Sequence, residues 1–331
     1  MKKLLLIFCF PILCFSQQSF NFIHDGINRE YIYYSPNNLP VNAPLVFVAH
    51  GFTGSAMGIM GYSGMNTVAD QNGFAVCYPK GTVDNWGNNF WNVGYDFHFG
   101  VTVDDVGFLE SLALYLQSTY QLSTTNTFIT GMSNGGEICY SLAFDGSNVF
   151  KAYAPVAGSV FPNGTVNNLF NPNTPAPFFI THGDNDNVTL YEGDLNDQFW
   201  GPYLGVDTLV DFWVNENSLT SVNIDTFPDL NNDGNITISK KYYSPLTNNE
   251  VWLYVHQNDH SWGDSDIIIE QEIWDFFSLY INNSSEVLEY NNNKKLVSIS
   301  NLFGQKINKS NNTFLLFLYD DGSVEKKLFF K

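Results

Sequence analysis

Short apolar runs alternate with amphipathic stretches along residues 17–283. This alternation of strands and helices is typical of an α/β fold with a mostly parallel sheet. Several of the runs are apolar throughout, as expected of strands that are buried on both faces of a sheet. We expect strands at residues 45–49, 74–78, 127–130, 152–156, 178–181 and 251–255.

Helical periodicity separates these strands. Between residues 104 and 120, the apolar side chains of Leu109, Leu112 and Leu116 recur with the spacing of one helix face. We expect helices at residues 104–120, 134–144, 206–217 and 266–281, and an antiparallel pair of strands at residues 20–23 and 29–33. We expect a hairpin that leads into residues 236–243. Together with the helix at 206–217, it would form a partial lid over the functional site.

Composition narrows the class of protein. The chain has 331 residues and is 44% hydrophobic, which fits one large globular domain with an appendage. Its net charge is −19, and residues 17–283 hold five basic and 28 acidic residues. Binding to nucleic acid is excluded, because neutralising phosphates needs clustered Lys and Arg, and binding to an anionic membrane is disfavoured for the same reason.

The first sixteen residues have the pattern of an address rather than of a fold. Two lysines precede an apolar run that is too short to span a bilayer, and Ser16 ends it. We predict a secretory signal peptide at residues 1–16 and a protein that is extracellular or at the cell surface. Its removal leaves Cys77 and Cys139, which we expect to be free buried thiols.

The C-terminal end is a separate unit. Residues 284–293 are polar and rich in Asn, which predicts a linker, and β-like runs follow at residues 296–299, 313–319 and 324–330. A tight turn is expected at residues 320–322. Residues 294–331 resemble the C-terminal sorting domain of the type IX secretion system, which implies the type IX secretion machinery as a partner. The alternative is a small β appendage for substrate binding.

One motif carries candidate chemistry. The predicted strand at 127–130 runs into the sequence GMSNGG at residues 131–136, and a helical stretch follows. This is G-x-S-x-G in the strand, turn and helix context that a nucleophilic serine needs. A side chain at Gly131 or Gly135 would collide with neighbouring backbone, and the helix directs its N–H groups at the site. We therefore assign Ser133 as the nucleophile.

A serine hydroxyl needs a base and an acid that orients this base. After this motif they follow in the order Ser, Asp or Glu, His. The strand at 178–181 leads to Asp186, and the strand at 251–255 leads to His260, so both lie at carboxyl ends of strands. We assign Asp186 as the acid, with Asp184 as its rival, and His260 as the base; His256 is expected to be a packed histidine.

Acyl transfer also needs two backbone donors for the oxyanion. The N–H of Asn134, directly after the nucleophile, is expected to be one. The other is expected from the loop HGFTG at residues 50–54, with Phe52 as the donor and Thr53 as its rival. The side chain of His50 is expected to order this loop.

Four segments together resemble a known family. They are HGFTG at 50–54, VDDVGFL at 103–109, GMSNGG at 131–136 and HSW at 260–262. They are similar to the secreted esterases grouped with poly(3-hydroxybutyrate) depolymerases and feruloyl esterases. The resemblance covers roughly residues 40–280 and implies an α/β-hydrolase fold, with Ser133, Asp186 and His260 as its catalytic triad.

Weaker signals concern the substrate and metals. Aromatic residues crowd the loop after residue 78, either as a substrate wall or as ordinary packing, and we assign Trp86, Trp91 and Trp262 to substrate binding. Residues 229–234, DLNNDG, imitate the start of a calcium loop, but Lys240 occupies the place of the bidentate Glu. We therefore expect a hairpin turn there, no metal site and no cofactor.

These features favour a secreted serine carboxylesterase. Its substrates would be feruloyl or acetyl esters of plant polysaccharide, or hydroxyalkanoate esters. Two alternatives remain open at this point: a serine peptidase on the same fold, and a noncatalytic surface protein that binds carbohydrate.

Overall fold

A computed structural model describes residues 19–162, 175–282, 296–301, 313–319 and 324–329. The signal peptide, the linker and the turn at 320–322 expected from the sequence lie outside these residues. The chain divides into two compact units, Met1–Asn282 and Asn283–Lys331. The second unit holds a three-stranded antiparallel sheet of β13 (Leu296–Asn301), β14 (Thr313–Tyr319) and β15 (Val324–Phe329).

The first unit is built on a ten-stranded sheet in the order β1-β2-β4-β3-β7-β8-β9-β12-β11-β10. Its six central strands run parallel, as the apolar runs predicted. Their bounds are Leu45–Ala49 for β3, Ala75–Pro79 for β4, Thr127–Met132 for β7, Phe150–Val156 for β8, Phe178–Gly183 for β9 and Val251–His256 for β12. Because they are parallel, the carboxyl ends of all six lie at one edge.

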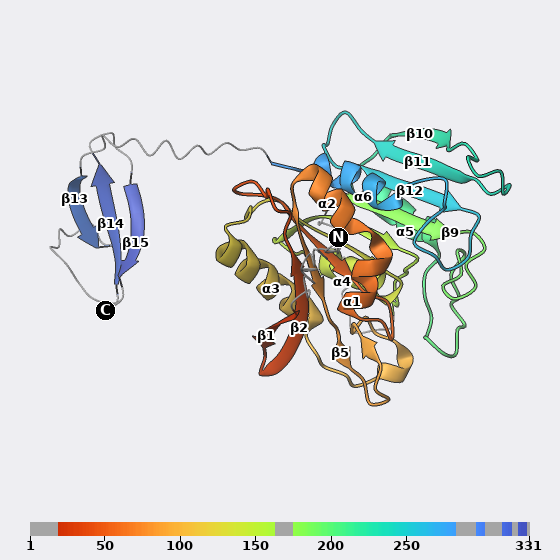
Figure 1. The fold of residues 1–331 in the computed structure, drawn as a ribbon, viewed down its shortest axis with the longest axis horizontal. Helices are drawn as coiled ribbons and strands as arrows, with labels where there is room; N and C mark the ends of the chain where they lie inside the picture. The colour runs from red at the N-terminus through yellow and green to blue at the C-terminus, as the bar shows by residue number, and fades with distance from the viewer. Residues whose placement is uncertain (1–18, 163–174, 283–295, 302–312, 320–323, 330–331) are drawn as a thin grey trace, which may run out of the picture. The chain divides into compact units, whose positions relative to one another are not determined.

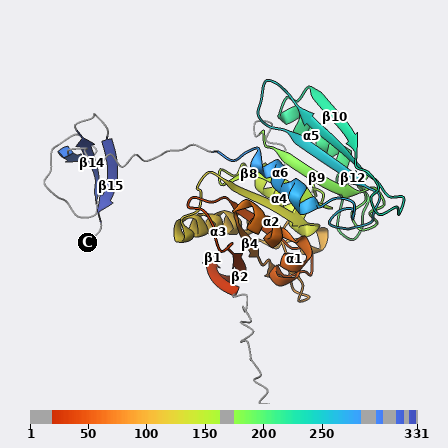
Figure 2. The same ribbon diagram turned by 45° about the horizontal axis from the view of Figure 1, so that its top comes forward.

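Helices cover both faces of this sheet (Figures 1 and 2). One hydrophobic core contains residues of α3 (Asp105–Tyr120), α4 (Asn134–Phe144) and α5 (Val206–Glu216). The other contains residues of α1 (Ala56–Ser63), α2 (Met65–Asn72) and α6 (Ile269–Ser278). The protein therefore has the layered α/β architecture that the sequence indicates.

Helices α1 and α2 were not expected. Each has eight residues, and α1 contains two glycines, so neither shows a long apolar period. Local signals define them instead: the Ser55 side chain accepts from the Gly58 N–H, and Gly64 and Gly73 end the two helices in the left-handed conformation.

The outer strands are antiparallel. At one edge β1 (Ser19–His24) and β2 (Ile27–Tyr34) form the expected hairpin. At the other, β10 (Ser221–Thr226) pairs with β11 (Thr237–Tyr243), and β11 pairs with β12. The expectation of a lid is therefore wrong: this hairpin extends the sheet, and α5 buries Leu209 and Trp213 in the core. Two short strands, β5 (Thr82–Val83) and β6 (Asn89–Phe90), make a separate hairpin after β4.

The turn between β7 and α4 is strained. Ser133 lies there with φ of 55°, in the left-handed region that residues with a side chain rarely adopt. Two glycines allow the close packing around it. A Cβ at Gly131 would lie 2.3 Å from the carbonyl oxygen of Gly135, and a Cβ at Gly135 would lie 2.2 Å from that of Ala49. The backbone of β3 thus lies so close to this turn that only glycine fits at positions 131 and 135.

We predict that Gly135→Ala destabilises the protein by roughly 2 kcal/mol or more, because backbone atoms would have to move. Gly61→Ala is the matched control, since Gly61 lies in α1 with nothing within 4 Å of a new Cβ. Alanine there should stabilise the helix by roughly 0.5–1 kcal/mol. Chemical denaturation of both variants measures the two changes, and equal stabilities would contradict the close approach.

Candidate active site

The loops after β9 and β12 bring Asp186 and His260 together. The two strands are parallel neighbours, with Gly183 beside His256, so their following loops leave the sheet side by side. Nδ1 of His260 lies 2.7 Å from Oδ2 of Asp186. The other carboxylate oxygen accepts from the backbone N–H groups of Val188 at 2.8 Å and Thr189 at 2.9 Å. The carboxylate is therefore held in place from both sides.

The surroundings of Asp186 keep it ionised. Burial pushes the pKa of its carboxyl upward, but the hydrogen bonds from His260 and from the two backbone amides outweigh burial, and its pKa is lowered. An ionised carboxylate accepts only, so Nδ1 of His260 carries the proton and Nε2 is left for other partners. The rival Asp184 is exposed, and its side chain accepts from Asn185.

A second histidine supports this acid. His182 is fully buried, and its Nε2 lies 2.7 Å from the carbonyl oxygen of Thr189 and 3.4 Å from Oδ2 of Asp186. Burial lowers its pKa, which leaves the ring neutral at pH 7. The sequence analysis missed this contact. His256, by contrast, is buried as expected, and both of its ring nitrogens lack a partner among the described residues.

Ser133 lies at the same edge of the sheet, at the end of β7. Its backbone N–H donates to Val156 on β8, and its side chain is partly exposed. The loop at residues 50–54 lies directly against it: a Cβ at Gly51 would be 3.4 Å from the Cβ of Ser133 and 4.0 Å from its Oγ. A substrate carbonyl at this oxygen would therefore meet the backbone of that loop.

The hydrogen bonds of this loop distinguish its two candidate oxyanion donors, Phe52 and Thr53. The N–H of Thr53 donates to Asn89 at 2.8 Å and that of Gly54 to Gly51 at 2.9 Å. No acceptor within the described residues takes the N–H of Phe52, which leaves it free for an oxyanion. The N–H of Asn134, in the first turn of α4, has no acceptor within its helix.

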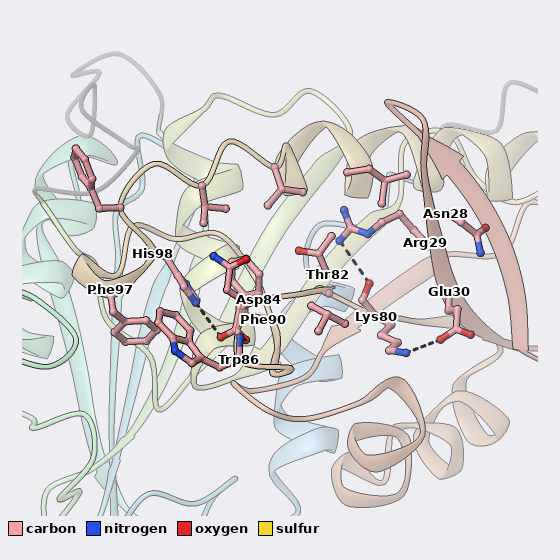
Figure 3. A pocket seen from close by; sticks show the side chains of 17 residues that line it. Asn28, Arg29, Glu30, Lys80, Thr82, Asp84, Trp86, Phe90, Phe97 and His98 are labelled. Carbon is pink, nitrogen blue, oxygen red and sulfur yellow. Dashed lines mark hydrogen bonds and ion pairs between the residues drawn. The ribbon is translucent and has the colours of Figure 1, made fainter.

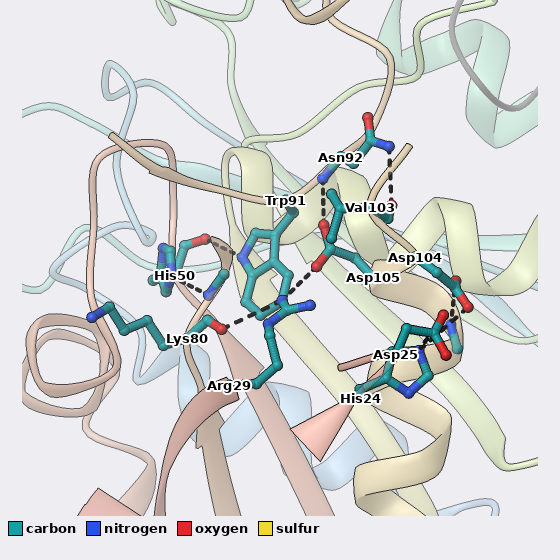
Figure 4. A network of polar contacts seen from close by, with 12 residues as sticks. His24, Asp25, Arg29, His50, Lys80, Trp91, Asn92, Val103, Asp104 and Asp105 are labelled. Atoms are coloured by element: carbon teal, nitrogen blue, oxygen red, sulfur yellow. Dashed lines mark hydrogen bonds and ion pairs between the residues drawn. The ribbon is translucent and has the colours of Figure 1, made fainter. Parts of the chain in front are cut away.

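Trp91 does not line a substrate site, contrary to the sequence interpretation. Its side chain is fully buried, and its Nε1–H donates to the carbonyl oxygen of His50 at 2.9 Å (Figure 4). Its backbone N–H donates to Oδ1 of Asn134 at 2.7 Å, and its carbonyl accepts from Nδ2 of Asn134 at 3.0 Å. Trp91 thus ties the loop that carries Phe52 to the turn that carries Asn134.

His50 orders the same loop. Its Nδ1 lies 2.7 Å from the carbonyl oxygen of Gly51, and its Nε2 accepts from the N–H of Gly81 at 3.0 Å. Burial lowers the pKa of this ring to about 4, so it is neutral at pH 7. A neutral ring with one protonated nitrogen satisfies both contacts, which gives His50 a structural part rather than a part in proton transfer.

Glu137 is a buried acid that the sequence analysis missed. Its Oε2 accepts from the hydroxyl of Tyr95 at 2.5 Å and from Nδ2 of Asn134 at 3.2 Å. Burial raises the pKa of its carboxyl to about 7, although these hydrogen bonds lower it in part. From sequence alone, an acid in the first turn of a helix indicates only a favourable contact with the helix dipole. Its burial, which the sequence does not show, is what raises its pKa.

The other two predicted substrate residues differ. Trp262 is 7% exposed and packs in the core with α6, so we correct its assignment to one of packing. Trp86 is 64% exposed and lines a cavity. Two other histidines contact acids: His24 lies 3.4 Å from Asp104, and His98 lies 3.2 Å from Asp84.

Two groups of acids and histidine within the described residues have ligand atoms within 4.8 Å of one another. One contains His24, and the other contains Asp229, Asp233 and Asp266. In the second, Asp266 arrives from the loop before α6 and brings a carboxylate that the calcium-like sequence lacks at Lys240. Such exposed acidic groups are common without an ion, and their proximity alone assigns none.

Comparison with known proteins finds related esterases. Residues 30–168 match the family model "Esterase PHB depolymerase". The chain is 30% identical over 183 residues to the bifunctional acetylxylan esterase/xylanase XynS20E of Neocallimastix patriciarum, covering 54% of this chain and 25% of that protein. It is 26% identical over 191 residues to the probable feruloyl esterase C of Aspergillus niger, covering 55% and 64%. The resemblance given by the sequence motifs is confirmed.

Solved structures agree on the fold. The acetyl xylan esterase from Aspergillus awamori superposes with a TM-score of 0.56 at 16% identity, over 79% of this chain and 98% of that one. This likeness confirms the α/β-hydrolase fold. The chain spans from a quarter to just under two thirds of the length of the first curated relatives that it matches.

The raised pKa of Glu137 predicts a stability that depends on pH. The folded state holds this proton more tightly than the unfolded state, so the contribution is complete below pH 4.5 and is lost as pH rises through about 7. Glu137→Gln removes it. We expect the melting temperature of the wild type, relative to this variant, to fall between pH 5 and pH 8. Calorimetry at several pH values measures the difference, and Glu192→Gln, at an exposed glutamate, is the control.

Proposed function

We propose that this chain, which carries an Esterase PHB depolymerase domain, is a secreted serine carboxylesterase. The observation that carries the proposal is the 2.7 Å contact between His260 and Asp186, at the same edge of the sheet as the strained turn of Ser133. This arrangement supports Ser133 as the nucleophile, His260 as the base and Asp186 as the acid.

In the proposed reaction, Oγ of Ser133 attacks the ester carbonyl, and Nε2 of His260 takes the proton. Asp186 fixes the tautomer of His260 and stabilises the imidazolium. The N–H groups of Phe52 and Asn134 donate to the tetrahedral oxyanion. His260 returns the proton to the leaving alcohol, and water then releases the acid from the acyl-enzyme by the same steps. Residues of this chain supply every catalytic group of these reaction steps, so the proposed reaction requires no cofactor.

The proposed substrates are acetyl or feruloyl esters of plant polysaccharide, or hydroxyalkanoate esters. The relatives named as acetylxylan esterase and feruloyl esterase support the first two. A serine peptidase with the same residues is the second candidate, and a noncatalytic carbohydrate-binding protein is the third. Assays of the purified protein on methyl ferulate, acetylated xylan, hydroxybutyrate oligomers and peptides compare these candidates directly.

We also propose that the two ends of the chain direct its export. Residues 1–16 would be removed as a signal peptide, and residues 294–331 would be recognised by the type IX secretion machinery. The separate three-stranded unit at the C-terminus supports a detachable tail. No helix of the described residues is long and apolar enough to cross a membrane.

We expect Ser133→Ala to abolish hydrolysis of p-nitrophenyl acetate, because the proposed mechanism has no other nucleophile. Asp186→Asn should lower kcat by roughly 10⁴-fold, since an amide favours the wrong tautomer of the histidine. Asp184→Asn is the matched control and should retain activity, because the Asp184 side chain is exposed and does not contact His260. Unchanged hydrolysis by Ser133→Ala would refute the serine mechanism and leave the noncatalytic candidate.

The export proposal has its own measurement. In a bacterium that has the type IX machinery, mass spectrometry of the secreted protein should find Gln17 at its start and no residues from 294–331. A truncated chain that ends at residue 283 should remain inside the cell. A secreted form that retains the tail would contradict its role as a sorting signal.

A further inference from the structure

A cavity of about 620 Å³ lies apart from the candidate catalytic residues. It opens between β2, the β5–β6 hairpin and the loop at residues 96–103 (Figure 3). Ser133, Asp186 and His260 are not among the residues that line it. Its volume falls within the range that is typical of sites for small ligands. The proposed mechanism of ester hydrolysis does not use this cavity.

One end of the cavity is aromatic. Trp86 is 64% exposed there, and its ring is held by two contacts: it stacks on His98 with centroids 6.2 Å apart and meets Phe97 edge-on at 6.0 Å. An exposed, fixed indole face is a surface on which the apolar face of a sugar ring can stack.

The loop that carries Trp86 is held rigid by a single carboxylate. Oδ1 of Asp84 accepts from the backbone N–H groups of Trp86 at 2.9 Å and Asn88 at 2.8 Å. Its Oδ2 lies 3.2 Å from Nε2 of His98. The aromatic surface is therefore formed before any ligand arrives, which lowers the entropic cost of binding.

Three of the residues that line the cavity have buried polar atoms without partners in the described part of the chain. Among the described residues, none bonds to Nε or Nη1 of Arg29, Oγ1 of Thr82 or Nδ1 of His98, all of which are buried. Figure 3 shows Arg29 and Thr82 on the side opposite Trp86 and His98. Burial lowers the pKa of His98, so its ring is neutral at pH 7; with Nε2 donating to Asp84, Nδ1 is an acceptor. The set thus combines donors and acceptors, and a hydroxyl group, which both donates and accepts, suits each of them.

The cations of the cavity are already paired. Arg29 is paired with Asp105 and Lys80 with Glu30, while the carboxylate of Asp84 faces the neutral ring of His98. No unpaired positive charge is left to bind an anion, and residues 17–283 together carry 28 acidic residues against five basic ones, which repels anions at long range. An uncharged ligand that is rich in hydroxyl groups is favoured over a uronate or a free hydroxycinnamate.

We propose that this cavity is a binding site for a neutral saccharide, with a sugar ring on Trp86 and its hydroxyl groups facing Thr82, His98 and Arg29. The binding itself does not depend on the esterase activity. If the proposed esterase function holds, the site would anchor the glycan part of an esterified polysaccharide.

The same hairpin connects the cavity to the candidate active site. The carbonyl of Asn89 on β6 accepts from the N–H of Thr53, and Nδ2 of Asn89 donates to the carbonyl of Gly54 at 2.7 Å. Gly81, which lines the cavity, donates to His50. A glycan bound at this hairpin would therefore lie against the segment that forms hydrogen bonds to the loop carrying the Phe52 amide.

Isothermal titration of the full chain with xylohexaose tests the proposal. This neutral probe contains no ester, so its binding is measured without turnover and whether or not the protein hydrolyses p-nitrophenyl acetate. We expect saturable binding with one site, at least tenfold weaker in Trp86→Ala and weaker in Thr82→Val. Tyr243→Ala, which removes an exposed aromatic ring from β11 outside the cavity, should bind as the wild type does.

Oligogalacturonate and ferulate, titrated in parallel, separate the saccharide from its rivals. Weaker binding of both, together with the loss in Trp86→Ala, supports the assignment. No binding of xylohexaose, or tighter binding of either anion, would overturn it. So would an affinity for xylohexaose in Trp86→Ala and Thr82→Val that equals that of the wild type. Melting curves of each variant ensure that lost binding is not lost folding.

Discussion

The buried ion pair between Arg29 and Asp105 is the contact on which the rest of the site depends. Both side chains are 1% exposed, with Nη2 of Arg29 2.5 Å from Oδ1 of Asp105. The guanidinium also lies 3.8 Å from the ring centroid of Phe108. Removing one partner of such a pair leaves an uncompensated buried charge and typically costs about 3–5 kcal/mol. The pair thereby fixes β2, which lies between β1 and β4 in the sheet, to the start of α3.

From this pair a continuous set of contacts leads to the oxyanion region. Oδ2 of Asp105 accepts from the N–H of Asn92 at 2.7 Å, which fixes the backbone next to Trp91. Trp91 then holds both His50 and Asn134, and Glu137 holds Asn134 from the other side. The two backbone amides proposed to bind the oxyanion are thus positioned by the buried residues Asp105, Trp91 and Glu137. Preorganised donors of this kind need no rearrangement when charge develops.

The sequence predicted the parallel strands, the longer helices and the strained serine turn, because these depend on local pattern and on glycine at fixed spacing. It predicted neither the burial of Trp91 nor the environment of Glu137, since both depend on contacts between segments 40 or more residues apart. Asp105 shows the same limit: two adjacent acids at the start of a helix both suit a cap, but only Asp104 caps α3, accepting from Gly107. The hairpin β10–β11 was placed over the site because polar strands give no sign of whether they pair with a sheet edge.

Cys77 and Cys139 are free and lie buried in the first unit. Burial raises the pKa of both thiols well above the ordinary value, so neither offers a thiolate to oxidants or alkylating reagents. No cross-link between these two cysteines secures the hydrolase unit, and its fold rests on packing and hydrogen bonds. Oxidative folding is accordingly no requirement for this unit, and a glutathione-rich cytoplasm is a suitable place in which to produce it.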